Sequence, residues 1–509
     1  MLNKRDRQIL YMNIQKSEVL IKIKNILFVA LFLFIGLFIF FHPVFLSTDL
    51  MPGDLGDARF INYVLEHGYL YLKGNALHSN FWDMPIFYPL KNTLAFSDIL
   101  LGGMIIYIPV RFFFNPQTSL QIWLFIVCIL NYFSMYFLLA KYFKFNPLSS
   151  SLGAFIFAFS LPRYAQIYHM QLYLHFYTVF SVICFISLKK DNSKLKNNLL
   201  FFFGVSLLAL QLYSSFYLGW FTIFASFLFL IIFLMFKKTR LKIFDFIKFY
   251  KKELLIYSVI FFLAVYPMCY HYLAVGTQFE FFDFDNLKIK SFLDSGSLID
   301  ILFFKSTFGN DCEQHLGIGY ITTLFLIFGM FFFKHRKYCL IFFISVILIF
   351  SFLPSRYVLY NIFPGACAIR ASSRIILLFL LFYSVFIAQF TQSIKNKFLL
   401  FFIVTLIVFE QIPARYHFEW SKKEHAKRLS VLYLDKSCKV VSYYMQDKKN
   451  LAPVSGFVLL DIIWFALSNN VYTTNGYSGY VPDKIESENI DGLCKYVVVS
   501  NKYFERRDK

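Results

Sequence analysis

A short polar stretch at residues 48–69 gathers carboxylates directly after a long apolar run. It holds Asp49, Asp54, Asp57, Arg59 and Glu66, of which Arg59 and Glu66 are candidate substrate-binding residues. The proline and glycines of "PGDLGDARF" favour a turn, after which Asp57 begins a helical pattern. A carboxylate at a membrane interface is partly removed from water, so it can act as a general base or bind a divalent cation. Alternatively, Asp57 only caps the helix, a position where aspartate is common.

Residues 159–176, "FSLPRYAQIYHMQLYLHF", carry tyrosines and histidines between two apolar runs. The tyrosines are typical of the aromatic belt at a membrane surface. His169 and Gln171 within that belt are better explained as hydrogen-bonding groups that face a polar ligand. This segment therefore supplies two candidate substrate-binding residues.

Two arginines, Arg370 and Arg374, follow the Pro-Gly pair of "YNIFPGACAIRASSRIILLF". On a helix, a spacing of four residues presents both guanidinium groups on one face. The planar guanidinium matches the geometry of a phosphate or pyrophosphate, so we expect these residues to bind a phosphorylated ligand. The alternative is that both side chains only reach the lipid headgroups.

Four further residues complete the candidate substrate-binding set. Glu313 precedes a glycine-rich helix start in "NDCEQHLGIGY", where capping is the alternative role, and Asp98 ends the first polar segment. Asn475 and Tyr477 lie in "TTNGYSGYVP", whose Asn-Gly and Ser-Gly pairs are typical of turns. A tyrosine on such a turn can also stack on the face of a sugar.

Membrane helices must position these residues. The chain has 509 residues, of which 58% are hydrophobic and 16% are charged, which indicates a polytopic membrane protein. Residues 26–46 are long enough to cross a hydrocarbon core of about 30 Å, and no cleavage site follows them. The formal charge of +20 falls in short clusters between apolar runs, which indicates membrane topology and not nucleic-acid binding.

The apolar runs and the basic clusters predict eleven spans, with residues 1–25 in the cytoplasm. The spans are expected near 26–46, 120–140, 149–163, 171–187, 199–213, 216–236, 254–273, 317–333, 338–353, 375–393 and 397–412. Residues 98–114 are short and contain Pro109 and Arg111, so we expect an interfacial or re-entrant segment there. The polar segments expected outside the cytoplasm, where the chemistry should lie, are 47–98, 274–316, 354–374 and 413–509.

Residues 26–412 are thus predicted to form a membrane body, and residues 413–509 a small extracytoplasmic α/β domain. Strand-like runs are expected at 438–444, 456–460 and 494–499, with an amphipathic stretch, "DIIWFALSNN", between them. Cys438 and Cys494 flank this domain, and an oxidising compartment would allow them to form a disulfide. No Cys/His spacing in the sequence indicates a structural metal.

The order of these motifs resembles bacterial multispanning glycosyltransferases of the GT-C fold. The features that carry the resemblance are the acidic motif after the first span, the His-x-Gln turn, the Pro-Gly loop before paired arginines, Glu410 at the end of the last span, and the Asn-Gly-Tyr-Ser-Gly loop. The resemblance covers nearly the whole chain. It implies an essential carboxylate in the first external loop, which makes Asp57 the first choice of catalytic base and Asp54 the second.

The resemblance also implies a reaction. Such enzymes transfer a sugar from a polyprenyl phosphate to an acceptor hydroxyl outside the cytoplasm, and a single displacement would invert the anomeric configuration. The chain is similar in size and composition to O-antigen serotype-converting glucosyltransferases, which implies a hexose, with glucose first, and a polysaccharide or lipid-linked acceptor at the bacterial inner membrane. The expected partners are the lipid-linked donor, this acceptor and the bilayer, without nucleic acid. Transfer with or without a divalent cation fits the sequence.

Other functions also suit a multispanning protein with external loops. A polysaccharide polymerase or ligase would place its active residues in a long loop between later spans, whereas here the acidic cluster comes first. A transporter of lipid-linked sugars would show charged residues in the middle of spans and repeated halves, and the sequence shows essentially no such charges and no such repeat. A purely structural membrane protein would leave the order of the polar motifs unexplained.

Overall fold

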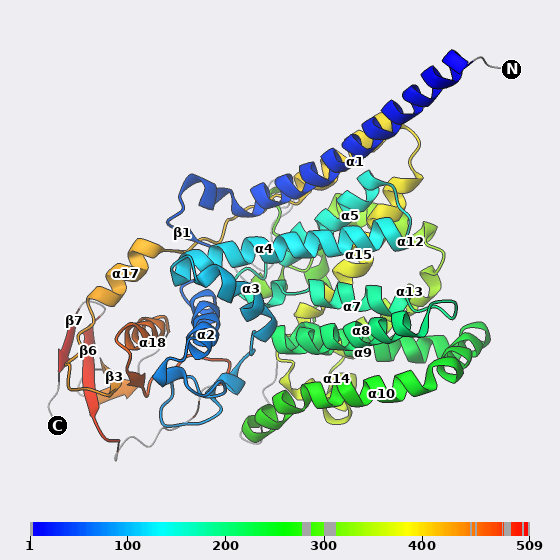
Figure 1. Ribbon diagram of the computed structural model, residues 1–509. Helices are drawn as coiled ribbons and strands as arrows, with labels where there is room; N and C mark the ends of the chain where they lie inside the picture. The colour runs from blue at the N-terminus through cyan, green and yellow to red at the C-terminus, as the bar shows by residue number, and fades with distance from the viewer. Residues whose placement is uncertain are drawn as a thin grey trace.

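Most of the chain is a bundle of apolar helices, with a small sheet near the carboxyl end (Figure 1). The computed structural model describes residues 4–276, 287–299, 312–447, 450–453, 456–480, 482, 490–500 and 503–506. The predicted external segment 274–316 therefore lies partly outside the described residues. Within them, the structure confirms the predicted fold class, an α-helical polytopic membrane protein with a small carboxyl-terminal α/β unit.

Helices with short connections make up the first half of the chain. They are α1 (Lys4–Leu46), α2 (Asp57–Leu72), α3 (Leu101–Arg111), α4 (Pro116–Phe137), α5 (Pro147–Phe159), α6 (Leu161–Tyr164), α7 (Phe176–Ile186), α8 (Lys194–Ser214), α9 (Phe216–Met235) and α10 (Lys237–Gly276). The backbone of α10 leaves helical geometry at Tyr250, which bends this 40-residue helix. The predicted interfacial segment 98–114 contains α3, a helix of 11 residues.

Among the residues that the structure describes, further helices of the second half continue the bundle. They are α12 (Tyr320–Phe332), α13 (Arg336–Ser351), α14 (Leu353–Ile362), α15 (Ile376–Ser393) and α16 (Lys397–Glu410). Glu410 caps α12 by accepting hydrogen bonds from the backbone amides of Ile321 (2.8 Å) and Thr322 (2.7 Å). This carboxylate therefore has a structural partner at the helix start, where orphan amides need acceptors.

Every predicted span contains a helix, but their lengths differ. Among the described residues, six helices are long and apolar enough to cross a membrane, or seven if the pair α13 and α14, bent by 93°, is counted as one span. The apolar helices α5, α7, α12 and α16 have between 11 and 14 residues. They are shorter than the roughly 20 residues that a straight crossing needs. The protein is therefore a multi-pass membrane protein in which several predicted spans are short.

The bundle packs around α5, which contacts α1, α4 and α15. Small residues permit the closest approaches. A side chain at Gly153 would collide with the Ser384 carbonyl of α15, and one at Gly329 of α12 would collide with the Phe386 carbonyl. Small residues at such crossings let helix backbones approach closely, which is how membrane helices gain packing energy.

The carboxyl-terminal unit contains a sheet with the strand order β4-β3-β6-β7, with β5 also paired to β3. Its elements are α17 (Lys422–Ser430), β3 (Val440–Asp447), β4 (Asn450–Pro453), α18 (Val458–Ser468), β5 (Tyr472–Thr473), β6 (Leu493–Ser500) and β7 (Tyr503–Arg506). Strands β3 and β6 are parallel, and Cys438 and Cys494 form a disulfide beside them. The strand predicted at 456–460 is wrong: α18 begins at Val458, because its apolar run continues with helical periodicity into the buried residues Ile462 and Trp464.

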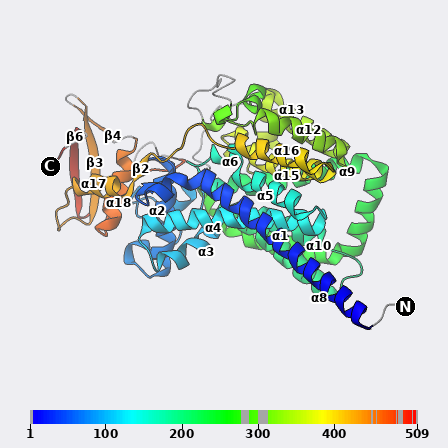
Figure 2. The same cartoon turned by 90° about the horizontal axis from the view of Figure 1, so that it is seen from above.

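This unit lies against the first loop and α2, whereas the amino-terminal end of α1 lies at the opposite end of the molecule (Figure 2). A two-stranded pairing joins the two parts of the chain, because β1 (Leu50–Met51) pairs antiparallel with β2 (Trp420–Ser421). Residues near 50 and near 420 therefore meet at one edge of the helical bundle, which is where the polar side chains gather.

Candidate active site

Asp57 begins α2, as the sequence predicts, but it is not the residue that caps the helix. Asp54 Oδ1 accepts the hydrogen bond from the Ala58 amide (3.0 Å), which is the capping role. The carboxylate of Asp57 is thereby left for other contacts, and 37% of its side chain is exposed. The capping explanation, which was open for Asp57, fits Asp54 instead.

The Asp57 carboxylate belongs to a chain of contacts with residues from four other, distant segments. Its Oδ2 lies 3.0 Å from His169 Nδ1, and the other ring nitrogen, Nε2, lies 2.7 Å from Glu313 Oε1. Arg374 donates from Nη2 to the same Glu313 oxygen (2.6 Å). On the opposite side, the Tyr477 hydroxyl donates to Asp57 Oδ1 (2.5 Å). We call Asp57, His169, Glu313, Arg374 and Tyr477 the polar cluster.

The loop that carries His169 is fixed from inside the bundle. Arg163 is fully buried, and its guanidinium donates from Nη1 to the carbonyl of Leu172 (3.2 Å). Asn131 of α4 and Gln211 of α8 donate side-chain hydrogen bonds of 2.6 Å to the carbonyls of the next two residues. Buried backbone groups are thus satisfied by side chains, as they must be away from water. His169 therefore projects from a rigid loop.

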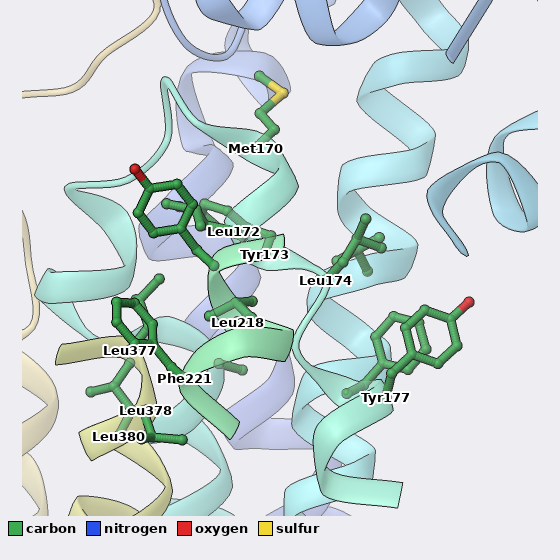
Figure 3. Packing of buried hydrophobic residues seen from close by; sticks show 14 of the residues in the cluster. Met170, Leu172, Tyr173, Leu174, Tyr177, Leu218, Phe221, Leu377, Leu378 and Leu380 are labelled. Carbon is green, nitrogen blue, oxygen red and sulfur yellow. The ribbon is translucent and has the colours of Figure 1, made fainter. Parts of the chain in front are cut away.

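Apolar packing holds the same loop down. Figure 3 shows Leu172 and Tyr173 of the loop beside Leu218 of α9 and Leu377 of α15, all in one buried cluster. Such a cluster resists displacement because each side chain would leave a cavity behind. Leu172 and Tyr173 of the loop thus pack into the bundle, whereas His169 of the same loop reaches the polar cluster.

The two arginines are organised by Tyr217, the second residue of α9. The Tyr217 hydroxyl accepts a hydrogen bond from the backbone amide of Arg370 (2.8 Å), and its ring lies 4.7 Å from the Arg374 guanidinium. Asp98 fixes the start of α9, since its Oδ1 accepts from the Phe216 amide (2.7 Å). The Arg370 side chain is exposed and the Arg374 side chain is 13% exposed, so one guanidinium is freely reached from solvent.

Charges in the cluster stabilise one another. Burial alone would raise the pKa of Asp57, but the hydrogen bond and the charge of His169 outweigh it and hold that pKa below its ordinary value. Burial and Arg374 would lower the pKa of His169, but the bonds to Asp57 and Glu313 raise it. Arg374 and His169 together overcome burial to lower the pKa of Glu313. These shifts favour the charged forms of Asp57, His169 and Glu313 beside the Arg374 guanidinium.

The structure brings several other predicted residues to the border of this cluster. Burial raises the pKa of Asp98, whose carboxyl is hydrogen-bonded by the side chain of Gln171. Burial also raises the pKa of Asp54, with Asp57 adding to the effect. Asn475 holds the turn that carries Tyr477, because its side chain bonds both the amide (2.7 Å) and the carbonyl (2.9 Å) of Tyr443.

Two predicted substrate-binding residues lie elsewhere. Arg59 is fully buried and pairs with Asp461 (2.7 Å) in the carboxyl-terminal unit. Glu66 is buried and pairs with Arg111 of α3 (2.8 Å). The helix separates both from Asp57, since a rotation of about 100° per residue turns positions 59 and 66 away from position 57. We therefore propose structural roles for these two residues.

Sequence reasoning missed Tyr217 and Arg163. The sequence could have indicated Tyr217, because residue 217 lies at the start of the predicted span 216–236. The outer end of that span is predicted to lie on the same side of the membrane as Arg374. Arg163 is in a segment that the sequence singled out, but no pattern distinguishes an arginine that holds a loop together from one that binds a ligand. Both residues position the cluster and do not lie within it.

The cluster combines two carboxylates with an imidazole and a guanidinium. Among the residues that the structure describes, no group of three or more His, Cys, Asp and Glu side chains is arranged to hold a metal ion. A separate apolar cavity of about 1000 Å³ lies beside the end of α2, lined by Gly68, Leu72, Trp82 and Met104 among others. Gly68 is about 16 Å along the helix from Asp57, so this cavity is distinct from the cluster.

Comparisons with known proteins give little direct guidance. No family model matches the sequence, and no curated protein matches it. Among solved structures, the chain is similar to the apo form of an oligosaccharyltransferase from Archaeoglobus fulgidus, with 11% sequence identity and a TM-score of 0.46. The match covers 89% of this chain and 64% of the archaeal chain, so this chain spans less than two thirds of that protein. The function therefore has to be argued from the site.

Proposed function

We propose that the protein is an inverting membrane glycosyltransferase. It would transfer a hexose, with glucose first, from a polyprenyl-phosphate carrier to a hydroxyl of a surface polysaccharide such as O-antigen. The observation that carries this proposal is the continuous chain of contacts from Asp57 through His169 and Glu313 to Arg374. It supplies a carboxylate for the acceptor and a guanidinium for the leaving phosphate, which are the two needs of such a transfer.

The reaction is a single displacement. The acceptor oxygen attacks the anomeric carbon and forms the new glycosidic bond, while the bond from that carbon to the phosphate oxygen breaks. The phosphate keeps the electron pair, and the acceptor proton passes to the carboxylate of Asp57. Arg370 and Arg374 stabilise the charge that grows on the leaving phosphate, because guanidinium groups match phosphate oxygens in geometry and charge. Attack from the face opposite the phosphate inverts the anomeric centre.

The depth of the site suits a lipid-borne donor. Arg374 and Tyr217 lie at the first turns of the candidate spans Ser372–Ser393 and Phe216–Met235. A phosphate bound there would sit at the membrane surface while its polyprenyl chain stays in the bilayer. The basic clusters between spans support placing this surface on the extracytoplasmic side of a bacterial inner membrane, with the amino terminus inside.

The test is sugar transfer in membranes supplied with polyprenyl-phosphate glucose, with the mass of the surface polysaccharide as the readout. Asp57→Asn should lower transfer by about 10²–10⁴-fold, the range for loss of a general base. Asp54→Asn is the discriminating partner, because Asp54 lies in the same loop and its Oδ1 accepts a hydrogen bond from the Ala58 backbone amide, a bond that the asparagine oxygen can also accept. It should retain most of the transfer.

Membrane insertion and thermal unfolding serve as controls for both variants. Full transfer by Asp57→Asn would sink the proposal. Loss in Asp54→Asn with normal transfer in Asp57→Asn would move the base to Asp54. Wild-type products with many added sugars per chain would favour a polymerase, and donor movement across the membrane without transfer would favour a transporter.

A further inference from the structure

The turn Asn475–Tyr480 contacts both functional ends of the site. Tyr477 donates its hydroxyl to Asp57 Oδ1 (2.5 Å), and the carbonyl of Gly479 accepts a hydrogen bond from Arg370 Nη1 (2.5 Å). A side chain at Gly479 would collide with Arg370 Nη2, so the glycine allows this approach. A single residue, Ser478, separates the two contacts. The turn therefore links the proposed base to a proposed phosphate ligand.

The two ends of this turn are held independently of the site. The carbonyl of Asn475 accepts from the Phe87 amide (3.2 Å), and the Tyr480 amide donates to the Phe96 carbonyl (3.1 Å). The Asn475 side chain adds two bonds to Tyr443 of β3. The middle of the turn, by contrast, reaches the helical bundle through Asp57 and Arg370. The contacts to Asp57 and to Arg370 are thus made by residues two positions apart on one turn.

The hydroxyl of Tyr477 occupies a position that the acceptor needs. A general base must lie within hydrogen-bond distance of the hydroxyl whose proton it takes. Asp57 Oδ2 faces His169 and Oδ1 accepts the bond from Tyr477. Burial and the Asp57 carboxylate raise the pKa of the Tyr477 phenol, so it stays protonated and cannot take the acceptor proton itself. An acceptor hydroxyl has to compete with this phenol for Asp57.

We propose that the donor phosphate draws Arg370 away from the Gly479 carbonyl, and that the turn then releases Tyr477 from Asp57 and opens the base to the acceptor. This rests on the proposed function, because it takes Asp57 as the base and Arg370 as a phosphate ligand. A guanidinium binds a phosphate anion more strongly than a neutral carbonyl, which supplies the driving force. Coupling of this kind is reciprocal, so a bound acceptor should in turn raise the affinity for the donor phosphate.

The first experiment detects the contact without any acceptor. The full chain carries 3-fluorotyrosine at position 477 in lipid nanodiscs. Its ¹⁹F resonance in Asp57→Ala, which removes the acceptor of the Tyr477 hydroxyl, marks the released state. Undecaprenyl phosphate should move the wild-type resonance to the Asp57→Ala position, whereas uncharged undecaprenol should not. Gly479→Ala, in which the new methyl group displaces Arg370, should already show the released resonance without lipid. A resonance that stays in place while undecaprenyl phosphate binds would overturn the proposal.

The second experiment reads the competition kinetically. Tyr477→Phe should lower the apparent KM for the acceptor on the order of tenfold, the size of one hydrogen bond to a charged group. Tyr472→Phe is the matched control, since it removes a phenol from the same unit at β5 and packs on Tyr88. A loss of kcat in Tyr477→Phe with an unchanged acceptor KM would contradict the proposal and make Tyr477 a positioning residue. Normal transfer by Asp57→Asn would mean that the proposed function itself fails. The transfer rate of Asp57→Asn and the acceptor KM of Tyr477→Phe therefore distinguish failure of the proposed function from failure of this inference.

Discussion

Two clusters of charged side chains begin in the first turn of α2. Each contains a histidine, and the pKa of the two histidines is shifted in opposite directions. His169 lies between the carboxylates of Asp57 and Glu313, which raise its pKa. His425 lies beside Arg59, with Nδ1 3.0 Å from the guanidinium, and burial together with that arginine lowers its pKa to about 3. The two carboxylates therefore favour the charged form of the His169 imidazole, whereas burial and the Arg59 guanidinium favour the neutral form of His425.

The two clusters also differ in how open they are. The side chain of Arg59 is 0% exposed, and its partner Asp461 also accepts a bond from Arg428 (2.7 Å), which ties α2 to α17 and α18. Asp57 is 37% exposed and can be reached by a ligand. A closed set of ion pairs fixes how two parts of a chain sit together, whereas an open one can bind and react. Access for a ligand, and not charge alone, therefore distinguishes the candidate active site from the structural cluster.

Among these predictions, we expect the largest difference between the two clusters when Arg374 is replaced, and we expect it in the rate of transfer. Arg374→Gln removes a guanidinium that we assign to the leaving phosphate and also removes the partner of Glu313. Transfer should fall by about 10²–10³-fold, the range for loss of one donor to a developing negative charge. The measurement is kcat with polyprenyl-phosphate glucose.

Thermal unfolding of Arg374→Gln is measured alongside, and Arg374→Lys, which keeps the charge but not the planar fork, should recover part of the rate. Equal loss in both variants would show that the fork matters and the charge does not. Wild-type rates in Arg374→Gln would remove Arg374 from the mechanism.

Loss of Arg59 should separate the clusters by stability. Arg59→Met leaves Asp461 with Arg428 alone in a buried site, so the free energy of unfolding should fall by about 3 kcal/mol, the low end for a broken buried ion pair. The rate per folded molecule should not change, because Arg59 does not touch the polar cluster. The measurement is chemical or thermal unfolding in detergent together with kcat. A large fall in kcat at unchanged stability would make Arg59 a functional residue after all.

Sequence patterns predicted most of the fold and the members of the site, but not which side chains contact one another. Long apolar runs predicted the segments that contain the bundle's spans, because burial in a bilayer imposes length and composition on a span. They did not predict α14 or α17, which lie in segments expected to be polar. The error at 456–460 arose because a short apolar run fits a strand or a buried helix equally well. His169, Glu313 and Arg374 were identified one by one from their places beside spans. That an imidazole bridges two carboxylates depends on contacts between residues more than 100 positions apart, which one sequence does not reveal.

The same limit explains Arg59 and Glu66. Both share a short polar stretch with Asp57, and the stretch alone suggests one site. Helical geometry could have separated them, because two residues correspond to about 200° and nine residues to about two and a half turns. Which of the resulting faces meets a ligand is then decided by the carboxyl-terminal unit, whose Asp461 covers Arg59. Sequence periodicity shows which residues share a helix face, and tertiary packing decides which face is buried and which can meet a ligand.

The charge state of His169 should produce a smaller effect, which is read through pH. Its pKa is raised from the ordinary value of 6.5, so its stabilising contribution is fully present below pH 6.5 and is lost as pH rises through the raised pKa. The pKa of Asp57 is lowered from 3.8, so that contribution is present above pH 3.8 and is lost as pH falls through the lowered pKa. The wild-type unfolding temperature should therefore fall by roughly 2 °C on the alkaline side of pH 6.5.

His169→Asn should lose this alkaline slope, because no imidazolium remains to be neutralised. Its transfer rate should also fall at a higher pH on the acid side than in the wild type, since the hydrogen bond and charge of His169 no longer oppose the effect of burial on the Asp57 pKa. His335→Asn is the control, because His335 is exposed in a turn between spans and should leave both profiles unchanged. An unaltered alkaline slope in His169→Asn would mean that His169 is neutral in the folded protein, and the contrast with His425 would disappear.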